Sequence, residues 1–141
     1  VDSEYHGIGA AIAKCLQVGM QLKVPYISII VGEGGSGGAI ALACGDKVFM
    51  FEDSIYSVLS PEGYASIMWK DSSKVQQAAE ALNLTPEWLQ ENGIIDQIIH
   101  EYHSGENLGP LRDFLANQFN ELANLPIDEF LRQREQRYRN F

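Results

Sequence analysis

Residues 32–38 constrain this chain more than any other segment, because five of these seven residues are glycine. The run Gly32-Glu33-Gly34-Gly35-Ser36-Gly37-Gly38 follows a β-branched stretch, Tyr26–Val31, which predicts a strand buried on both faces. An almost wholly apolar stretch, Ala39–Cys44, comes next and predicts a short buried helix that Gly45 ends. Glycine loses the most backbone entropy on folding, so a loop this rich in glycine requires a packing or a chemical reason.

The packing reason would be a loop that crosses so close under the sheet that no Cβ fits. The chemical reason would lie in the backbone, because a Gly-Gly peptide at the start of a helix leaves N–H groups without acceptors and aimed outward. The helix dipole adds partial positive charge there. Such a site can hold a phosphate, or the oxygen of a developing enolate or carbonyl group. Both reasons stay open at this point.

Three known loop types can be compared with the run. A Walker-type loop requires Gly-Lys-Ser/Thr at its end, and Gly38 is followed by Ala39-Ile40. A dinucleotide fingerprint fits by letter at 32–37, but a helix of about six residues is too short for that fold. A nucleophile elbow, Gly-x-Ser-x-Gly, matches 34–38 and requires a partner histidine. The three histidines all lie in predicted loops or near a terminus: His6, His100 and His103. An oxyanion hole of backbone N–H groups, with no side-chain nucleophile, remains.

Length and composition bound the remaining possibilities. The 141 residues correspond to one domain, residues 1–141. Ten basic against 19 acidic side chains give a net charge of −9, which disfavours nucleic acid as a partner. Cys15 and Cys44 stand among small apolar residues, which predicts buried free thiols and a reducing, cytosol-like compartment. No apolar run reaches the ~20 residues of a membrane-spanning helix, and Val1-Asp2-Ser3-Glu4 resembles neither a signal nor a transit peptide.

Strand and helix patterns follow one another along the rest of the chain, which indicates an α/β fold. Further strands are predicted at Lys47–Phe51, Ser54–Leu59 and Ile94–Ile99. Helices are predicted at Gly9–Leu22 (with a broad buried face), Tyr64–Lys70, Ser72–Asn83, from Thr85 to near Gly93, from Leu111 to Leu122, and from Asp128 into the arginine-rich end. So few strands make a thin sheet, and the architecture looks incomplete, as if more strands belong upstream.

Several segments together resemble the carboxyltransferase alpha subunit of bacterial-type acetyl-CoA carboxylase. The most specific are the glycine run within Val31–Ala39 and the Ser60-Pro61-Glu62-Gly63 motif within Tyr56–Lys70. The similarity continues through Gly45–Val48, Ala78–Leu82, Ile94–Ile99 and the arginine-rich end. It therefore covers nearly the whole chain, in order.

The resemblance implies a crotonase-like fold of repeated β-β-α units. It implies transfer of a carboxyl group from carboxybiotin, held on a biotin carboxyl carrier protein, to acetyl-CoA, which gives malonyl-CoA for fatty acid synthesis. The Gly37–Gly38 peptide matches the alpha-side oxyanion hole, which accepts the ureido oxygen of biotin. The neighbouring residues expected to contact substrate are Gly34, Gly35, Ser36 and Ala39.

The resemblance also implies partners. A beta subunit with a zinc ribbon would bind much of the CoA and complete the active site. The implied assembly is an alpha2-beta2 hetero-oligomer, in a bacterial cytoplasm or a plastid stroma. No metal ligand is expected in this chain itself. The sequence departs from the family in one respect: a loop of the Thr-Pro-Gly-Ala-Tyr-Pro-Gly type is expected before the first helix, and Val1-Asp2 leads straight into Ser3–Gly7. The chain corresponds to roughly the second half of an alpha subunit.

Two competing interpretations stay open: a crotonase-like acyl-CoA enzyme that needs no biotin, and a fragment that binds a partner without turnover. Other residues have mainly structural interpretations. Glu62 is expected to cap a helix, Tyr64 and Trp69 to lie in the core, and Ser36 to bond within its own loop. For the arginines of the last helix we weigh a solvated helix face against contact with CoA phosphates or an acidic partner; they are Arg132, Arg134, Arg137 and Arg139.

Overall fold

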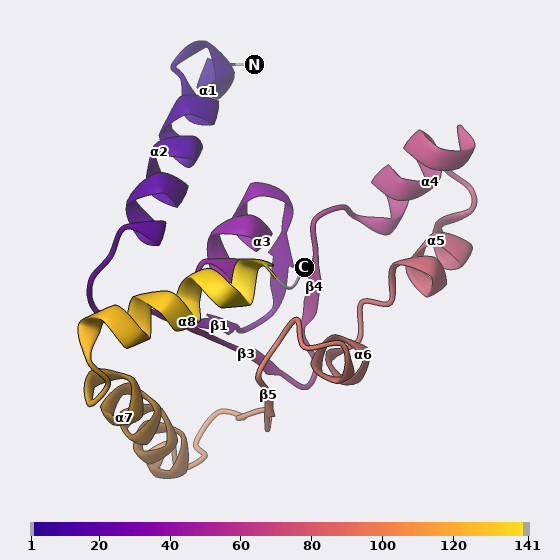
Figure 1. The fold of residues 1–141 in the computed structure, drawn as a ribbon. Coiled ribbons are helices and arrows are strands. Elements are labelled where there is room, and N and C mark those ends of the chain that lie inside the picture. Colours follow the sequence, from indigo (N-terminus) through magenta and orange to yellow (C-terminus); the bar gives the residue numbers. More distant parts are fainter. Residues whose placement is uncertain (1, 140–141) are drawn as a thin grey trace.

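The strands of the chain form two parallel sheets, a larger and a smaller one (Figure 1). The computed structural model describes residues 2–139. Val1, Asn140 and Phe141, which belong to the predicted domain 1–141, lie outside the described residues. The larger sheet has the order β1-β3-β5, built from β1 (Ile27–Ile30), β3 (Lys47–Phe51) and β5 (Gln97–Ile99). The smaller sheet pairs β2 (Glu33–Gly35) with β4 (Ile55–Ser57). The predicted α/β class is confirmed.

The chain passes twice through the same order of elements. A strand of the larger sheet is followed by a strand of the smaller sheet and then by a helix: first β1, β2 and α3 (Ser36–Ala43), then β3, β4 and α4 (Pro61–Trp69). This is the β-β-α repeat that the resemblance to the carboxyltransferase family implies. It places the ends of β2 and β4 beside each other, since Gly35 is in register with Ser57.

The remaining helices are α1 (Asp2–Tyr5), α2 (Ile8–Met20), α5 (Val75–Leu82), α6 (Pro86–Glu91), α7 (Gly109–Ala123) and α8 (Ile127–Arg139). The helices α4 and α6 each begin with a capping hydroxyl followed by Pro. Ser60 Oγ accepts from Gly63 N at 3.1 Å, and Thr85 Oγ1 accepts from Trp88 N at 3.5 Å. Ser60 therefore caps α4, where we expected Glu62 to do so. The helix α1 was not predicted.

Two apolar clusters flank the larger sheet. One gathers under α3 and α6, around Ile30, Met50, Tyr56 and Leu89. The other lies against α7, where Phe49 and Phe114 pack with ring centroids 4.9 Å apart. The pattern follows from the strands, because successive residues of β3 point to opposite faces and both faces are covered.

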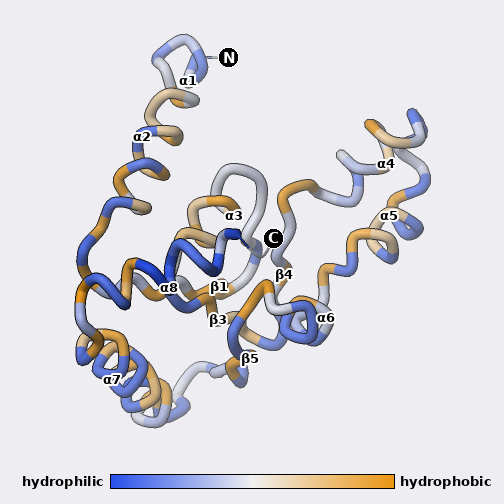
Figure 2. Tube along the Cα trace, in the orientation of Figure 1, coloured by the Kyte–Doolittle hydropathy of each residue, from blue (hydrophilic) through white to orange (hydrophobic). Residues whose placement is uncertain are grey.

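The first long helix, α2, was expected to have a broad buried face, and this prediction is wrong. The helix has no buried residue, and Ile8, Ile12 and Val18 are each 40–45% exposed. It extends away from the sheets in Figure 1, and Figure 2 shows apolar positions along it. Its Cys15 is exposed, whereas Cys44 is buried, so the thiol prediction holds only for Cys44. The apolar pattern of α2 is typical of a helix with a buried face, but few of the described residues pack against that face.

The last helix, α8, is tied by two buried or half-buried arginines to the residues just ahead of β3 and β5. Arg134 Nε and Nη2 donate to Asp46 Oδ1 and Oδ2 at 2.6 and 2.8 Å, and Arg137 Nη1 donates to Asp96 Oδ2 at 2.8 Å. The two carboxylates also accept from Tyr26 N and Val48 N. Neither interpretation offered for these two arginines is right, because their partners lie within the chain. Arg132 and Arg139 do lie on a solvated face and pair with acids of their own helix.

Two further core predictions differ from the structure. Trp69, expected in the core, is 37% exposed at the end of α4 and meets the ring of half-buried Tyr64 edge-on, with centroids 5.4 Å apart. The helices α4 and α5 contact each other and stand apart from the sheets in Figure 1. None of the helices within residues 2–139 is long and apolar enough to cross a bilayer.

Candidate oxyanion site at the turn between β2 and α3

The glycine run is not a loop throughout. Its first part is the strand β2, Gly35 is the N-cap of α3 with extended backbone, and the helix begins at Ser36, three residues earlier than predicted. Gly37 and Gly38 therefore lie in the first helical turn. The N–H groups of Ser36, Gly37 and Gly38 have no carbonyl one turn earlier to bond, and Gly35 supplies no side-chain cap. The turn thus presents backbone donors at the positive end of a helix dipole.

Ser36 has a left-handed backbone, with φ 51°. A non-glycine residue pays a steric cost in this region, and the conformation turns the chain sharply from strand to helix. The predicted bond from Ser36 to its own loop is not formed among the described residues. Within residues 2–139 no hydrogen bond joins Ser36 to a histidine: His6 Nδ1 lies 2.8 Å from Asp2 O, and His100 Nδ1 lies 2.9 Å from Glu52 Oε1. In this part of the chain the sharp turn carries Ser36 without a hydrogen-bonded base to activate it.

The glycines of the run have two different reasons to be glycine. A Cβ on Gly34 would lie 2.9 Å from Tyr56 Cδ2 and 3.2 Å from Leu42 Cδ1, so packing excludes any side chain there. A Cβ on Gly38 would meet nothing within 4 Å. Gly37 is intermediate, because its Cβ would touch Ile12 Cγ2 at 3.4 Å. The packing reason therefore applies to Gly34, while the space in front of Gly38 is open.

The predicted contact residues separate in the same way. Gly35, Ser36 and Gly38 are exposed and Gly37 is half-buried. The residues that carry the free N–H groups are therefore accessible from outside. Gly34 and Ala39 are buried, and Ala39 is 2% exposed. Those two lie behind the surface that a substrate would meet and support it from below.

A pocket of about 290 Å³ adjoins the turn on the side of the smaller sheet. Its wall includes Glu33, Gly35, Ser57 and Glu62. The serine hydroxyl is engaged, since Ser57 Oγ donates to Leu59 O at 2.8 Å. No cluster of three His, Cys, Asp or Glu side chains that could hold a metal is found within residues 2–139. The site can therefore offer backbone donors to an oxyanion.

Sequence reasoning missed two side chains that support the turn. Tyr56 lies under Gly34, and Ile12 of α2 lies against Gly37. The alternation Ile55-Tyr56-Ser57 was a usable signal for Tyr56, because it places the ring on the inner face of β4. No local signal pointed to Ile12, whose contact depends on how α2 crosses α3.

Solved structures share the fold of this chain. The chain superposes on a Pseudomonas malonate decarboxylase hetero-tetramer crystallised with coenzyme A, with TM-score 0.76 and 16% identity over 95% of this chain and 55% of that one. Transcarboxylase 12S gives TM-score 0.73 and 21% identity over 89% and 26%. A probable enoyl-CoA hydratase from Mycobacterium thermoresistibile gives 0.62 and 16% over 98% and 59%. At these identities the likeness concerns the fold, and the fold is crotonase-like, as predicted.

Sequence comparison narrows the class to a family. All of residues 1–141 match the family described as acetyl co-enzyme A carboxylase carboxyltransferase-like. The acetyl-coenzyme A carboxylase carboxyl transferase subunit alpha of Streptococcus uberis is 50% identical over 143 residues, which cover 100% of this chain and 56% of that protein. The corresponding subunit of Streptococcus sanguinis is 46% identical over the same shares. The chain belongs to this carboxyltransferase family, and it spans about half the length of the curated relatives it matches.

Proposed function

We propose that this chain provides the alpha-side oxyanion site of a carboxyltransferase that moves a carboxyl group from carboxybiotin to acetyl-CoA. The observation that carries the proposal is Gly38. Glycine loses more backbone entropy on folding than alanine does, and no neighbour within the described residues requires it at this position. A molecule from outside that approaches the backbone closely would require it.

The residues fit the group that the family implies. Carboxybiotin, bound to a separate carrier protein, would supply the carboxyl group and leave negative charge on its ureido oxygen. The N–H groups of Gly37 and Gly38 would donate to that oxygen as charge develops. Loss of one donor from an oxyanion hole typically costs about 3–4 kcal/mol. The bare Cα of Gly38 leaves room for a flat ring to come within hydrogen-bonding distance of the backbone.

No side chain of the turn needs to carry a proton in this proposal. Acetyl-CoA would be deprotonated at its methyl carbon, the proton would end on the biotin nitrogen, and the new carbanion would bond to the released carboxyl carbon. A beta subunit would hold the CoA and its enolate oxygen, and any zinc would belong to that subunit. We further propose an alpha2-beta2 assembly served by a biotin carboxyl carrier protein, in a bacterial cytoplasm or a plastid stroma.

The test is a substitution series in the assembled carboxyltransferase, assayed in reverse with malonyl-CoA and a free biotin derivative. We expect Gly38→Val to abolish carboxyl transfer while the complex still assembles, because its side chain would keep the substrate away from N–H groups that the substitution leaves in place. The loss of even one donor typically lowers kcat by about 10²- to 10³-fold. Ser36→Ala and Glu62→Gln should each keep most of the activity, because neither side chain acts as acid or base. Normal turnover by the Gly38 variant would refute the oxyanion assignment.

The similarity of fold to enoyl-CoA hydratases favours a second candidate, a biotin-independent acyl-CoA enzyme. The same series separates the two. A fall of ~10²-fold or more in either Ser36→Ala or Glu62→Gln, the size expected for a lost general acid or base, would support the second candidate. So would turnover of an acyl-CoA without any biotin acceptor. A complex that assembles but turns over neither substrate would support the non-catalytic interpretation.

A further inference from the structure

Three tyrosine hydroxyls donate to backbone carbonyls of one short helix, α3. Tyr56 Oη donates to Ala39 O at 2.7 Å, and Tyr26 Oη donates to Ala41 O at 3.3 Å. Tyr138 Oη donates to Ala43 O and lies 3.5 Å from Gly45 O. The helix has only eight residues, and its first turn carries the free N–H groups of the candidate site. Half of the chain's six tyrosines therefore converge on one element.

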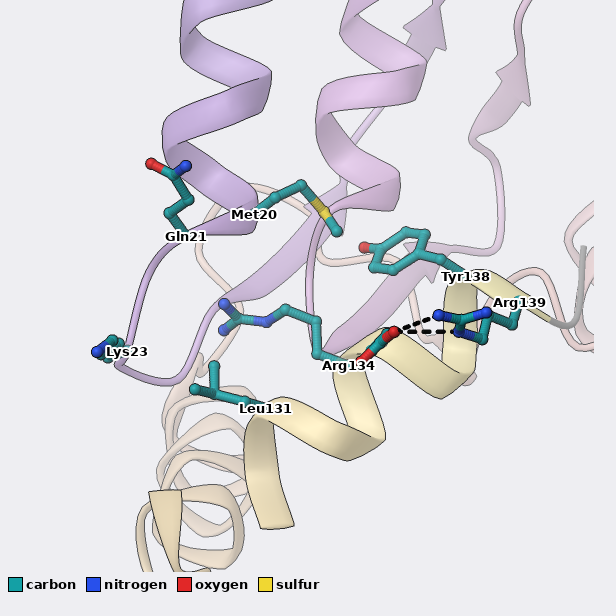
Figure 3. Close-up of a pocket in the computed structure, with 8 residues that line it drawn as sticks. Met20, Gln21, Lys23, Leu131, Arg134, Tyr138 and Arg139 are labelled. Atoms are coloured by element: carbon teal, nitrogen blue, oxygen red, sulfur yellow. Dashed lines mark hydrogen bonds and ion pairs between the residues drawn. The ribbon is translucent and has the colours of Figure 1, made fainter. Parts of the chain in front are cut away.

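The three donors come from three separate parts of the fold. Tyr26 lies just ahead of β1, Tyr56 is the middle residue of β4, and Tyr138 belongs to α8. Figure 3 shows Tyr138 beside Arg134 on the wall of a pocket of about 700 Å³ between the end of α2 and α8. Because Arg134 ties α8 to Asp46, the helix that carries Tyr138 is itself anchored to the sheet.

The directions of the three bonds restrain the helix from more than one side. Residues four apart on a helix are rotated by about 40°, so Ala39 and Ala43 share a face, whereas Ala41 lies about 160–200° round the axis. Two tyrosines therefore hold one side of α3 and the third holds the opposite side. Tyr56 does more, because its ring also fills the space under Gly34, with which it is in register.

We propose that Tyr26, Tyr56 and Tyr138 are positioning residues of the oxyanion site, which fix α3 so that the N–H groups of Gly37 and Gly38 stay aimed at one point. This rests on the proposed function. A preorganised oxyanion hole depends on donor placement, and small displacements of a reacting group lower rates by as much as ~10²-fold. Ala39, which Tyr56 holds, directly follows Gly38. The first turn of α3 is therefore restrained next to the donors themselves.

The experiment compares Tyr→Phe variants in the assembled carboxyltransferase, because phenylalanine keeps the ring and removes only the donor. We expect Tyr56→Phe to lower kcat about tenfold, less than the ~10²-fold that a misplacement of about 1 Å can cause, with KM for malonyl-CoA little changed from the parent. Tyr138→Phe and Tyr26→Phe should also lower kcat. The effect of Tyr26→Phe should be the smallest, because its bond to Ala41 O, at 3.3 Å, is longer than the 2.7 Å bond of Tyr56 to Ala39 O. Tyr64→Phe is the matched control, since its hydroxyl bonds to nothing among the described residues.

Amide hydrogen exchange supplies a second readout that does not depend on activity. Exchange in a peptide covering 36–44 should accelerate in the Tyr56 variant, while a peptide from α7 in the same sample should not change. A lower kcat without faster exchange in 36–44, or faster exchange without a lower kcat, would each overturn the positioning role. So would effects no larger than those of Tyr64→Phe.

The outcomes also distinguish this inference from the proposed function. If the parent complex shows no carboxyl transfer, the proposed function fails, and the positioning role at that site fails with it, whatever the exchange data show. If the parent is active and all three variants match it in kcat, only the positioning role fails. If Tyr56→Phe does not fold, Tyr26→Phe tests the positioning role instead, because it removes a longer hydrogen bond of a half-buried side chain.

Discussion

Gly34 and Gly38 are the same residue type four positions apart, yet the structure gives them opposite surroundings. The first is pressed against a buried ring, and the second faces open space. The sequence left a packing and a chemical reason for the glycine run as alternatives, and each reason applies to a different glycine. No pattern of letters could separate them, because the ring that excludes a side chain at Gly34 belongs to Tyr56 on another strand.

This difference predicts opposite effects of one substitution on stability. Gly38→Ala should stabilise the protein by about 0.5 kcal/mol, because alanine loses less backbone entropy and its Cβ meets no neighbour. Gly34→Ala should destabilise it by about 1–3 kcal/mol, the cost of overpacking a core. Urea denaturation of the two variants beside the parent measures both. Equal destabilisation would mean that the space in front of Gly38 is filled.

Tyr56 predicts a loss of stability at high pH. Burial raises the pKa of its hydroxyl from 10 to about 12, while Arg137 opposes the rise and Cys44 adds to it. Since the folded state favours the neutral phenol, the stabilisation, about 3 kcal/mol for two pKa units, is complete below pH 10. It is lost as the pH rises from 10 to 12. Free energies of unfolding measured from pH 8 to 11.5 should fall less steeply for Tyr56→Phe than for the parent, and parallel curves would contradict this.

Among the helices, α8 is held by an ion pair between residues far apart in the sequence, Arg134 and Asp46. The Arg134 side chain is 2% exposed and the Asp46 side chain 4%, and 88 positions separate them. Arg134 also donates to Leu22 O and Val24 O and lies over the ring of Phe130, 4.8 Å from its centroid. The guanidinium is therefore fully engaged by the chain. This explains why a row of arginines that suggested a ligand surface is partly internal.

We expect Arg134→Ala to destabilise the protein by about 3–5 kcal/mol, because it leaves the Asp46 carboxylate buried without its partner. Arg132→Ala, on the solvated face of the same helix, should cost far less, because solvent screens an exposed ion pair. Thermal unfolding of the pair provides the comparison. Similar losses in both variants would show that helix propensity, and not the buried ion pair, governs the stability of α8.

The elements that the sequence predicted well are those whose signal is local. Alternating or continuous apolar runs identified β1, β3 and β5, and the Ser-Pro and Thr-Pro starts identified α4 and α6. The strand β2 was missed because Glu33-Gly34-Gly35 has little intrinsic strand tendency and is a strand only through its pairing with β4. The backbone N–H groups exposed at the start of α3 could be anticipated from the glycine pair, and their role as oxyanion donors stays a prediction. The three tyrosines that bond to α3 could not be anticipated, since their acceptors are backbone atoms.

The molecule as a whole leaves much apolar surface uncovered. Exposed large apolar residues occur on several elements, among them Ile8 and Val18 on α2, Ile40 on α3, and Ile67 and Met68 on α4. A sheet of three strands with a second of two offers too little area to bury them all. Large exposed apolar patches in soluble proteins usually mark contact surfaces.

We therefore expect the 141-residue chain on its own to associate, either with itself or with a partner. Sedimentation velocity over a range of concentrations measures this directly. Replacing Ile8 and Val18 by serine should shift the distribution toward smaller species if α2 takes part in the contact. A well-folded monomer at every concentration, in parent and variant alike, would contradict the expectation.

The ion pairs of α8 also set an order of events during translation. A ribosome adds about 5–20 residues per second, so Asp46 leaves it roughly 4–18 s before Arg134, which follows 88 positions later. Through that interval the Asp46 carboxylate lacks Arg134, whereas Asp96 can already pair with Lys47, whose Nζ lies 3.5 Å from Asp96 Oδ1. The contact between α8 and the residue that precedes β3 can therefore form only after almost all of this segment has been made, and apolar surface that α8 covers stays accessible to chaperones during those seconds.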